Sequence, residues 1–185
     1  MGFPELSTER LRLTAMSDKD TEQILELFSN PLVTEYYDLE TLTGLDQASK
    51  IIRLFNARFE EELGIRWAIR LKNSDRLIGT CGFNSWTVTM RSAVIGYDLM
   101  PDYWNQGYMT EALKSIVHIA FSGELPCSTI HRIQADVVEG NTASCSVLAN
   151  VGFKLEGIRR QSGYWKESYH DLKCFGLLSS DGYIP

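Results

Sequence analysis

The sequence lacks the long apolar run that a membrane-spanning helix needs, and its start, Met1 to Glu5, lacks the basic and apolar regions of a signal peptide. Leu6 also stands where a myristoylation signal would carry Ser or Thr. We therefore expect a cytoplasmic protein with no membrane partner. The strings G-x-G-x-x-G and G-x-x-x-x-G-K-S/T are absent as well, so the dinucleotide-binding and P-loop folds fit poorly.

Cysteine and positive charge are both scarce. The four cysteines (Cys81, Cys127, Cys145 and Cys174) form no C-x-x-C pair, and the three histidines do not cluster with them, so we expect no metal site. The net charge of -6 argues against a nucleic-acid surface and favours a cationic partner, such as an amine or a basic peptide. At 185 residues the chain is expected to form one domain, residues 1–185, with its core between about 8 and 180.

Hydrophobic periodicity predicts elements in the order β-α-α-β-β-β-α-β-α-β-β. Strands are expected at 8–16, 65–71, 77–83, 93–100, 130–138, 153–162 and 169–178. Helices are expected between Ser17 and Asn30 and at 46–63, 110–121 and 141–150, whereas residues 32–44 fix no structure. This order predicts an α+β fold, a mixed sheet with helices on its faces.

The stretch from Tyr97 to Thr110 organises these elements, because it combines a strand end, a turn, a glycine-containing loop and a helix start. The first turn of a helix has free backbone N–H groups and a partial positive charge, which attract phosphate. Gly107 lies where the backbone would come closest to such a group. Many strand-to-helix turns contain one glycine and bind nothing, so this stretch alone leaves a plain turn and a phosphate site both open.

Five strings occur in order along the chain: T-E-R-L-R-L at 8–13, Y-W-N-Q-G-Y-M-T-E-A at 103–112, N-T-A-S at 141–144, G-F-K-L-E-G at 152–157 and Y-H-D at 169–171. With the order of elements, they resemble the GCN5-related N-acetyltransferases (GNAT), and most of all the ribosomal-protein alanine N-acetyltransferase branch. The resemblance implies the GNAT fold, a mixed, mostly antiparallel, twisted sheet flanked by about four helices. It also implies acetyl-CoA as cosubstrate, and no metal.

The resemblance implies that backbone N–H groups of the 104–110 loop hold the CoA diphosphate, and that a strand edge pairs with the pantetheine arm. That edge is expected to be opened by a bulge and by divergence from the 130–138 strand. The implied cofactor contacts are Leu99, Met100, Gln106, Gly107, Tyr108, Met109, Thr110, Asn141 and Ser144. In the superfamily's Q/R-x-x-G-x-G/A loop, Trp104 stands at the first position and Met109 at the last, where a small residue is usual.

Ser144 is the implied candidate for the general acid that protonates the leaving thiolate. N-x-x-S at a helix start is also a capping pattern, so Asn141 and Ser144 have a purely structural alternative. The general base remains unassigned: Asp136, Glu139, His170 and Asp171 are candidates, and Gly163 stands where some ribosomal-protein enzymes carry a Glu. The aromatic residues that could line an acceptor site, or only pack, are Trp86, Tyr164, Trp165 and Tyr169.

The resemblance therefore implies acetyl transfer to a primary amine, first of all the N-terminal amine of a protein such as a ribosomal protein. One alternative keeps this chemistry but uses a small-molecule amine, such as a polyamine, an amino acid or an aminoglycoside. Another alternative is an acyl-CoA-binding module without catalysis. The family implies a monomer or a homodimer.

Overall fold

The computed structural model describes residues 2–182. Its strands are β1 (Leu6–Ser7), β2 (Leu11–Thr14), β3 (Ile65–Leu71), β4 (Leu77–Thr87), β5 (Ser92–Leu99), β6 (Arg132–Val138), β7 (Lys154–Trp165) and β8 (Ser168–Leu178). Its helices are α1 (Thr21–Phe28), α2 (Pro31–Thr34), α3 (Leu45–Glu60), α4 (Tyr108–Ser122) and α5 (Thr142–Val151), with 3-10 turns η1 (Asp18–Asp20) and η2 (Pro101–Tyr103).

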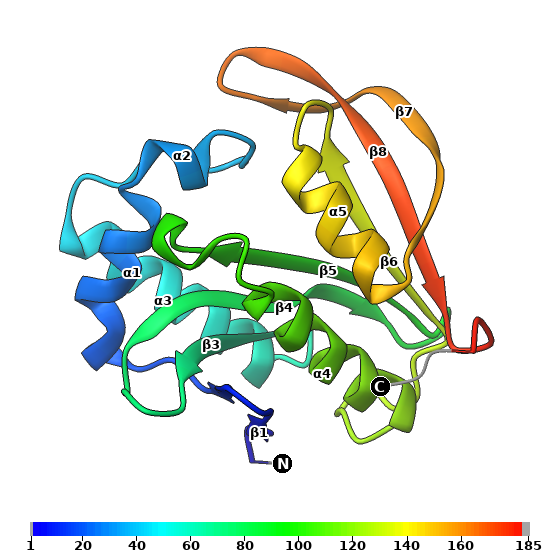
Figure 1. Cartoon of the computed structure of the whole chain (residues 1–185), viewed down its shortest axis with the longest axis horizontal. Helices are drawn as coiled ribbons and strands as arrows, with labels where there is room; N and C mark the ends of the chain where they lie inside the picture. The colour runs from blue at the N-terminus through cyan, green and yellow to red at the C-terminus, as the bar shows by residue number, and fades with distance from the viewer. Residues whose placement is uncertain (1, 183–185) are drawn as a thin grey trace.

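The strands form one eight-stranded sheet in the order β1-β2-β3-β4-β5-β6-β8-β7 (Figure 1). Within residues 2–182, β5 and β6 form the one parallel pair, and the other neighbouring strands pair antiparallel. The predicted α+β class, with a mixed and mostly antiparallel sheet, is confirmed.

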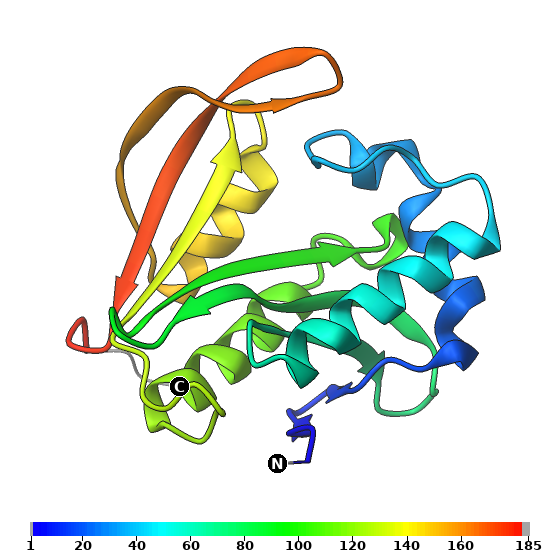
Figure 2. The same cartoon turned by 180° about the vertical axis from the view of Figure 1, so that it is seen from behind.

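Helices cover both faces of the sheet. Figure 1 shows α4 and α5 in front of it, and Figure 2, seen from behind, shows α3 in front. Leu113 and Ile116 of α4 are fully buried in the core on the first face, and Phe28, Ile52 and Phe55 of α1 and α3 lie in a second core. The helical spacing of these apolar residues explains why each helix packs one side onto the sheet.

The two strands β5 and β6 separate soon after they begin to pair. Their register joins Ser92 to Arg132, Ala93 to Ile133 and Val94 to Gln134, and beyond that point the strands diverge (Figures 1 and 2). Residues 95–99 of β5 therefore keep pairing with β4 but have no strand on their other side, and we call this side the β5 edge. The expected divergence is present, whereas the register shift lies between Phe83 and Ser85, which places the bulge in β4.

Several boundaries differ from the sequence-based expectation for local reasons. The strand expected at 8–16 is shortened to β2 at 11–14, and it begins late because the Thr8 N–H donates to the Leu11 carbonyl (3.0 Å) and the Leu11 N–H donates to Thr8 Oγ1 (3.1 Å). This turn separates β1 from β2. Pro31 does end the preceding helix, but it also starts α2, since the Asn30 side chain accepts a hydrogen bond from the Leu32 N–H (3.0 Å).

Candidate active site

The loop before α4, residues 104–110, provides a group of backbone donors. Gly107 has φ 78° and ψ 0°, a left-handed conformation that glycine adopts without strain, and α4 begins at Tyr108. Glu111 is the first residue of the helix whose N–H reaches back, to the Gly107 carbonyl (3.0 Å). The N–H groups of Tyr108, Met109 and Thr110 therefore have no helical acceptor, which is the arrangement that binds phosphate oxygens.

The side chain of Met109 does not obstruct these donors. It is 5% exposed and belongs to the core cluster between the sheet and α4. Only its backbone N–H is therefore presented at the start of the helix. The residues present fit a diphosphate, because the loop combines a left-handed glycine with three unused N–H groups and an inward-facing Met109.

Arg10 fixes this loop from β2's side of the sheet. Its guanidinium donates to the Gln106 carbonyl (2.9 Å) and to Glu111 (2.7 Å), and it lies over the Tyr108 ring, 4.3 Å from the centroid. Glu111 also accepts hydrogen bonds from Thr8 Oγ1 (2.6 Å) and from the Arg10 N–H (2.8 Å). Partial burial of Glu111 opposes its ionisation, but the hydrogen bonds from Thr8 and Arg10 outweigh it and lower its pKa.

Arg10 thus balances the one acidic side chain in the first turn of α4. Sequence reasoning missed this role, because Arg10 entered it only as part of the T-E-R-L-R-L string and its partners lie about 100 positions away.

Backbone alternation decides which groups the β5 edge presents. The Met100 N–H donates to the Ile78 carbonyl of β4 (2.9 Å), so it is not available at the open edge. The backbone N–H and carbonyl of the adjacent Leu99 point away from β4. The Leu99 carbonyl accepts a hydrogen bond from Trp104 Nε1 (2.7 Å). By the same alternation, the Leu99 N–H and the backbone groups of Tyr97 face the open edge.

The start of α5 brings Ser144 next to Tyr97 of β5, with Asn141 at the N-terminal end of the helix. The Asn141 side chain accepts a hydrogen bond from the Ser144 N–H (3.0 Å), so Asn141 is the N-cap of α5. The Ser144 hydroxyl takes no part in capping and lies 2.6 Å from the Tyr97 hydroxyl. The structure therefore brings Ser144 to β5 through Tyr97, a residue that sequence reasoning did not select.

The candidate bases differ in what they already contact. Asp136 pairs with Arg159, and Asp171 accepts a hydrogen bond from the Gln161 N–H (2.7 Å). The His170 ring stacks on Trp165, with centroids 4.3 Å apart, and its Nε2 lies 3.2 Å from the Trp165 carbonyl oxygen. The Glu139 side chain is exposed and makes no hydrogen bond or ion pair within residues 2–182. The Glu139 carboxylate and one ring nitrogen of His170 are thus the candidate bases with the fewest hydrogen bonds within residues 2–182.

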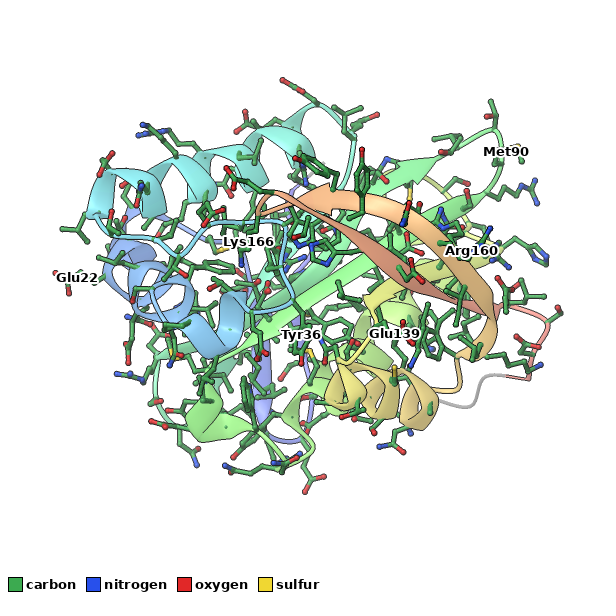
Figure 3. All side chains as sticks on the ribbon, turned by 90° about the horizontal axis from the view of Figure 1, so that it is seen from above. Glu22, Tyr36, Met90, Glu139, Arg160 and Lys166 are labelled. Carbon is green, nitrogen blue, oxygen red and sulfur yellow. The ribbon has the colours of Figure 1, made fainter. Side chains whose placement is uncertain are left out.

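Two contacts connect residues 34–36, at the end of α2, to the β7–β8 turn and to the turn after β6; Figure 3 labels Tyr36 and Lys166. Lys166, in the turn between β7 and β8, donates to the Thr34 carbonyl of α2 (2.5 Å). Tyr36 lies against Gly140, where a Cβ atom would be 3.5 Å from the Tyr36 ring. Both contacts join segments on opposite sides of the diverging strands. Sequence reasoning could not pair residues so far apart in the chain.

The aromatic candidates divide into two groups. Trp86 is 9% exposed, lies in the core and donates through Nε1 to the Glu62 carbonyl (2.5 Å). Tyr164 and Tyr169 are 63% and 67% exposed on the β7–β8 hairpin, with ring centroids 4.8 Å apart. Trp86 therefore packs, whereas the hairpin aromatic residues remain accessible.

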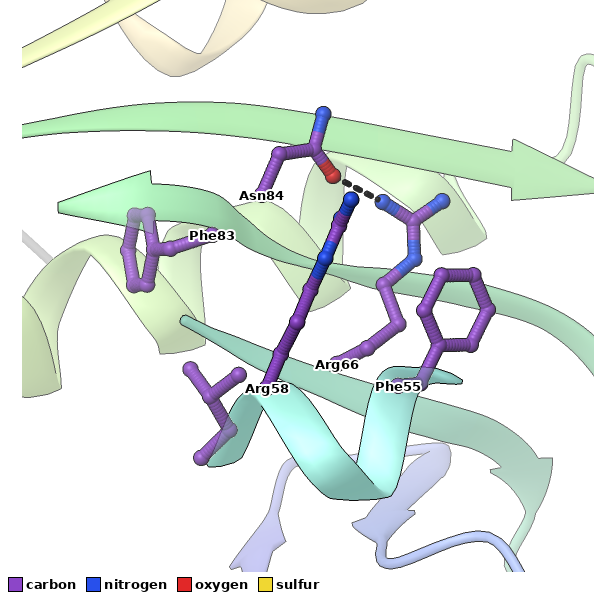
Figure 4. Close-up of a pocket in the computed structure, with 6 residues that line it drawn as sticks. Phe55, Arg58, Arg66, Phe83 and Asn84 are labelled. Carbon is purple, nitrogen blue, oxygen red and sulfur yellow. Dashed lines mark hydrogen bonds between the residues drawn. The ribbon is translucent and has the colours of Figure 1, made fainter. Parts of the chain in front are cut away.

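A buried ion pair fixes the face of β5 that points toward α3. Arg66 pairs with Asp98 and donates to Thr80 Oγ1 (3.0 Å) and to Asn84 Oδ1 (2.9 Å). Figure 4 shows Asn84 bonded to Arg66, with Phe55 beside them. Burial opposes the charge of Arg66, but the nearby Tyr37 and Asp98 raise its pKa, so it stays cationic. The network gives the β5 edge a rigid support.

Residues 2–182 contain neither a membrane-spanning helix nor a cluster of metal ligands. No helix there has both the length and the apolar character that crossing a bilayer requires. No three side chains among His, Cys, Asp and Glu come together as ligands for a metal ion in that part of the chain.

Comparison with known proteins identifies the family. The acetyltransferase (GNAT) domain family matches residues 10–154. The uncharacterized N-acetyltransferase YoaA of Bacillus subtilis (strain 168) is 37% identical over 176 residues, which cover 95% of this chain and 97% of YoaA. The ribosomal-protein-serine acetyltransferase of Escherichia coli (strain K12) is 33% identical over 105 residues, 56% of each chain.

The fold is shared with a solved enzyme that holds the cofactor. The structure of the RimL ribosomal L7/L12 alpha-N-protein acetyltransferase in complex with coenzyme A matches with a TM-score of 0.82 at 22% identity, covering 95% of this chain and 98% of that one. The predicted GNAT fold is confirmed by this likeness. The chain therefore belongs to the GNAT family and is an N-acetyltransferase.

Proposed function

We propose that this protein transfers the acetyl group of acetyl-CoA to the N-terminal amine of a protein, such as a ribosomal protein. The observation that carries the proposal is the divergence of β5 and β6, with unused N–H donors at α4 and the Ser144 hydroxyl beside the Tyr97 hydroxyl of β5. The names of the RimL structure and of the E. coli relative support a ribosomal-protein acceptor.

Acetyl-CoA binding would use backbone groups at two places. The N–H groups of residues 106–110 would hold the diphosphate at the start of α4. The amide-rich pantetheine arm would pair with the β5 edge as an added strand. A backbone N–H of that edge would then lie beside the thioester and stabilise the oxyanion of the tetrahedral intermediate. Trp104 already occupies the Leu99 carbonyl, so the edge would offer the Leu99 N–H and the groups of Tyr97.

The chemistry moves protons at the acceptor nitrogen and at the leaving sulfur. The amine nitrogen attacks the thioester carbon, and the C–S bond then breaks with its electron pair on sulfur. Ser144 would give its hydroxyl proton to that sulfur and would regain one, directly or through water, from the nitrogen, which loses a proton as the amide forms. This help is modest because a thiol has a pKa of about 8.5. The ammonium form of the acceptor must first lose a proton, and its pKa is near 10. Glu139 or His170, directly or through water, would accept it.

The contacts of Lys166 with Thr34 and of Tyr36 with Gly140 would narrow the path by which an acceptor amine reaches the thioester. A chain end or a small amine can pass between segments joined in this way more easily than a lysine on a folded surface. The net charge of -6 also favours a positively charged acceptor. The same features suit a small-molecule amine, so the experiment must include both classes.

The test is to incubate the protein with acetyl-CoA and measure thiol release with matched acceptors. The acceptors are ribosomal-protein N-terminal peptides, the same peptides with blocked N-termini, and a polyamine, an amino acid and an aminoglycoside. The proposal expects turnover with free N-termini and none after blocking. Turnover with the small amines alone would transfer the assignment to that class, and CoA binding without any turnover would contradict the proposal.

A further inference from the structure

We propose that Tyr97 is a positioning residue for Ser144: its phenol donates a hydrogen bond to Ser144 Oγ and so leaves the serine proton available for the departing sulfur. This inference rests on the proposed function, because it concerns the group that would protonate the departing sulfur. Capping of α5 requires neither hydroxyl, because the Asn141 side chain already caps this helix.

The hydrogen bonds around Ser144 leave few arrangements for its proton. The Ser144 N–H is used by Asn141 (3.0 Å), and its carbonyl lies in the first turn of α5, where it accepts a helical hydrogen bond. The Tyr97 hydroxyl lies 2.6 Å from Ser144 Oγ, a contact in which either oxygen can be the donor, and it also has donor geometry toward the Ser144 carbonyl oxygen (3.2 Å). One proton lies between the two hydroxyls. When Tyr97 supplies it, the serine proton must point away from Tyr97.

Tyr97 is well suited to be the fixed donor of this pair. It sits on β5 opposite Cys81, on the residues that have lost β6 as a neighbour, and its ring packs partly into the core. A tyrosine has only two side-chain torsions, so packing holds its hydroxyl firmly. Burial raises the pKa of Tyr97 and outweighs the hydrogen bond with Ser144, which lowers it, and the nearby Cys145 and Asp98 add to the rise, so the phenol keeps its proton at neutral pH.

Donation by Tyr97 would assist the reaction in a specific step. As Ser144 gives its proton to sulfur, negative charge grows on Oγ, and a donor aimed at Oγ stabilises that charge. Tyr97 itself neither loses nor gains a proton in this scheme. The effect should therefore appear in kcat and should depend on the presence of the serine hydroxyl.

The first experiment is a double-mutant cycle with Tyr97→Phe, Ser144→Ala and the double variant. Tyr97→Phe should lower kcat about three- to tenfold, with the affinity for CoA unchanged. In the Ser144→Ala background the same change should alter kcat by less than about twofold, since the partner is gone. Equal losses in both backgrounds would overturn the inference. Tyr103→Phe is the matched control, because its hydroxyl makes no hydrogen bond within residues 2–182.

A second measurement needs no acceptor and so separates this inference from the proposed function. Ser144→Cys is made together with Cys145→Ala, and the thiolate pKa of the new cysteine is read from its alkylation rate against pH. A donor to the thiolate lowers that pKa, so adding Tyr97→Phe should raise it by at least about half a unit. An unchanged value would overturn the role of Tyr97. Absence of turnover in the unmodified protein with every amine would instead overturn the proposed function.

Discussion

At the scale of residues, the loop before α4 depends on how Arg10, Glu111 and Met109 are placed. A carboxylate in the first turn favours the helix but competes with an incoming phosphate for the same N–H groups. Arg10 removes this conflict by binding Glu111 and the Gln106 carbonyl together. The Met109 side chain packs into the core, so it does not cover the free N–H groups at the start of α4. Each residue therefore serves stability and leaves the donors accessible.

The Arg10–Glu111 contact should make stability depend on pH. The pKa of Glu111 is lowered in the folded state, so its contribution is present above its unfolded value of about 4.3 and is lost as pH falls through the folded value. Glu111→Gln should cost about 1 kcal/mol of unfolding free energy at pH 7 and less at pH 3, because pH 3 lies below the unfolded pKa. Urea unfolding at both pH values measures this, with the exposed Glu22→Gln as control. An equal loss at both pH values would contradict the account.

Met109 provides a prediction that separates packing from binding. Met109→Ala removes a buried side chain and should lower the unfolding free energy by about 2–4 kcal/mol. Met109→Leu conserves volume and should cost less than about 1.5 kcal/mol. Calorimetric titration with CoA at a temperature where both variants are folded should give an unchanged affinity. A large gain or loss of affinity in the alanine variant would show that the side chain faces the cofactor.

At the scale of elements, the site is made where regular pairing stops. The β5–β6 pairing ends at Val94, α4 begins at a left-handed glycine, and α5 begins at an asparagine cap. Periodicity and capping patterns predicted these elements from local sequence. They could not predict that Trp104 would bond the Leu99 carbonyl or that β1 would separate from β2. Those details depend on single side-chain hydrogen bonds that no periodic pattern records.

Substitutions at Asn141 can show whether this residue only caps α5 or also contacts CoA. Aspartate is as good an N-cap as asparagine, so Asn141→Asp should keep the melting temperature, whereas Asn141→Ala should cost about 1 kcal/mol. If Asn141 also contacts CoA, the added negative charge should weaken CoA binding severalfold in the stable aspartate variant. Thermal unfolding and CoA titration of both variants measure this. Unchanged CoA affinity in both would leave Asn141 with the capping role alone.

At the scale of the whole molecule, the site joins residues that are distant in the chain. Turn and capping patterns placed Gly107 and Asn141 correctly at helix starts, because these signals are local. Tyr97 and Ser144 are 47 positions apart, and Arg10 is 96 positions from Gln106. One sequence contains no signal for such pairs, so the loop support and the hydroxyl pair required the structure. The same holds for the hydrogen bond from Lys166 to the Thr34 carbonyl, which joins residues 132 positions apart.

The most direct test of the central claim is to find where the acetyl group goes. A peptide with a free N-terminal amine and an internal lysine is incubated with the protein and acetyl-CoA, and the product is fragmented in a mass spectrometer. The account predicts an acetyl group on the N-terminal nitrogen and none on the lysine. An acetyl group on the lysine alone, or an unmodified peptide while a small amine is acetylated, would contradict it.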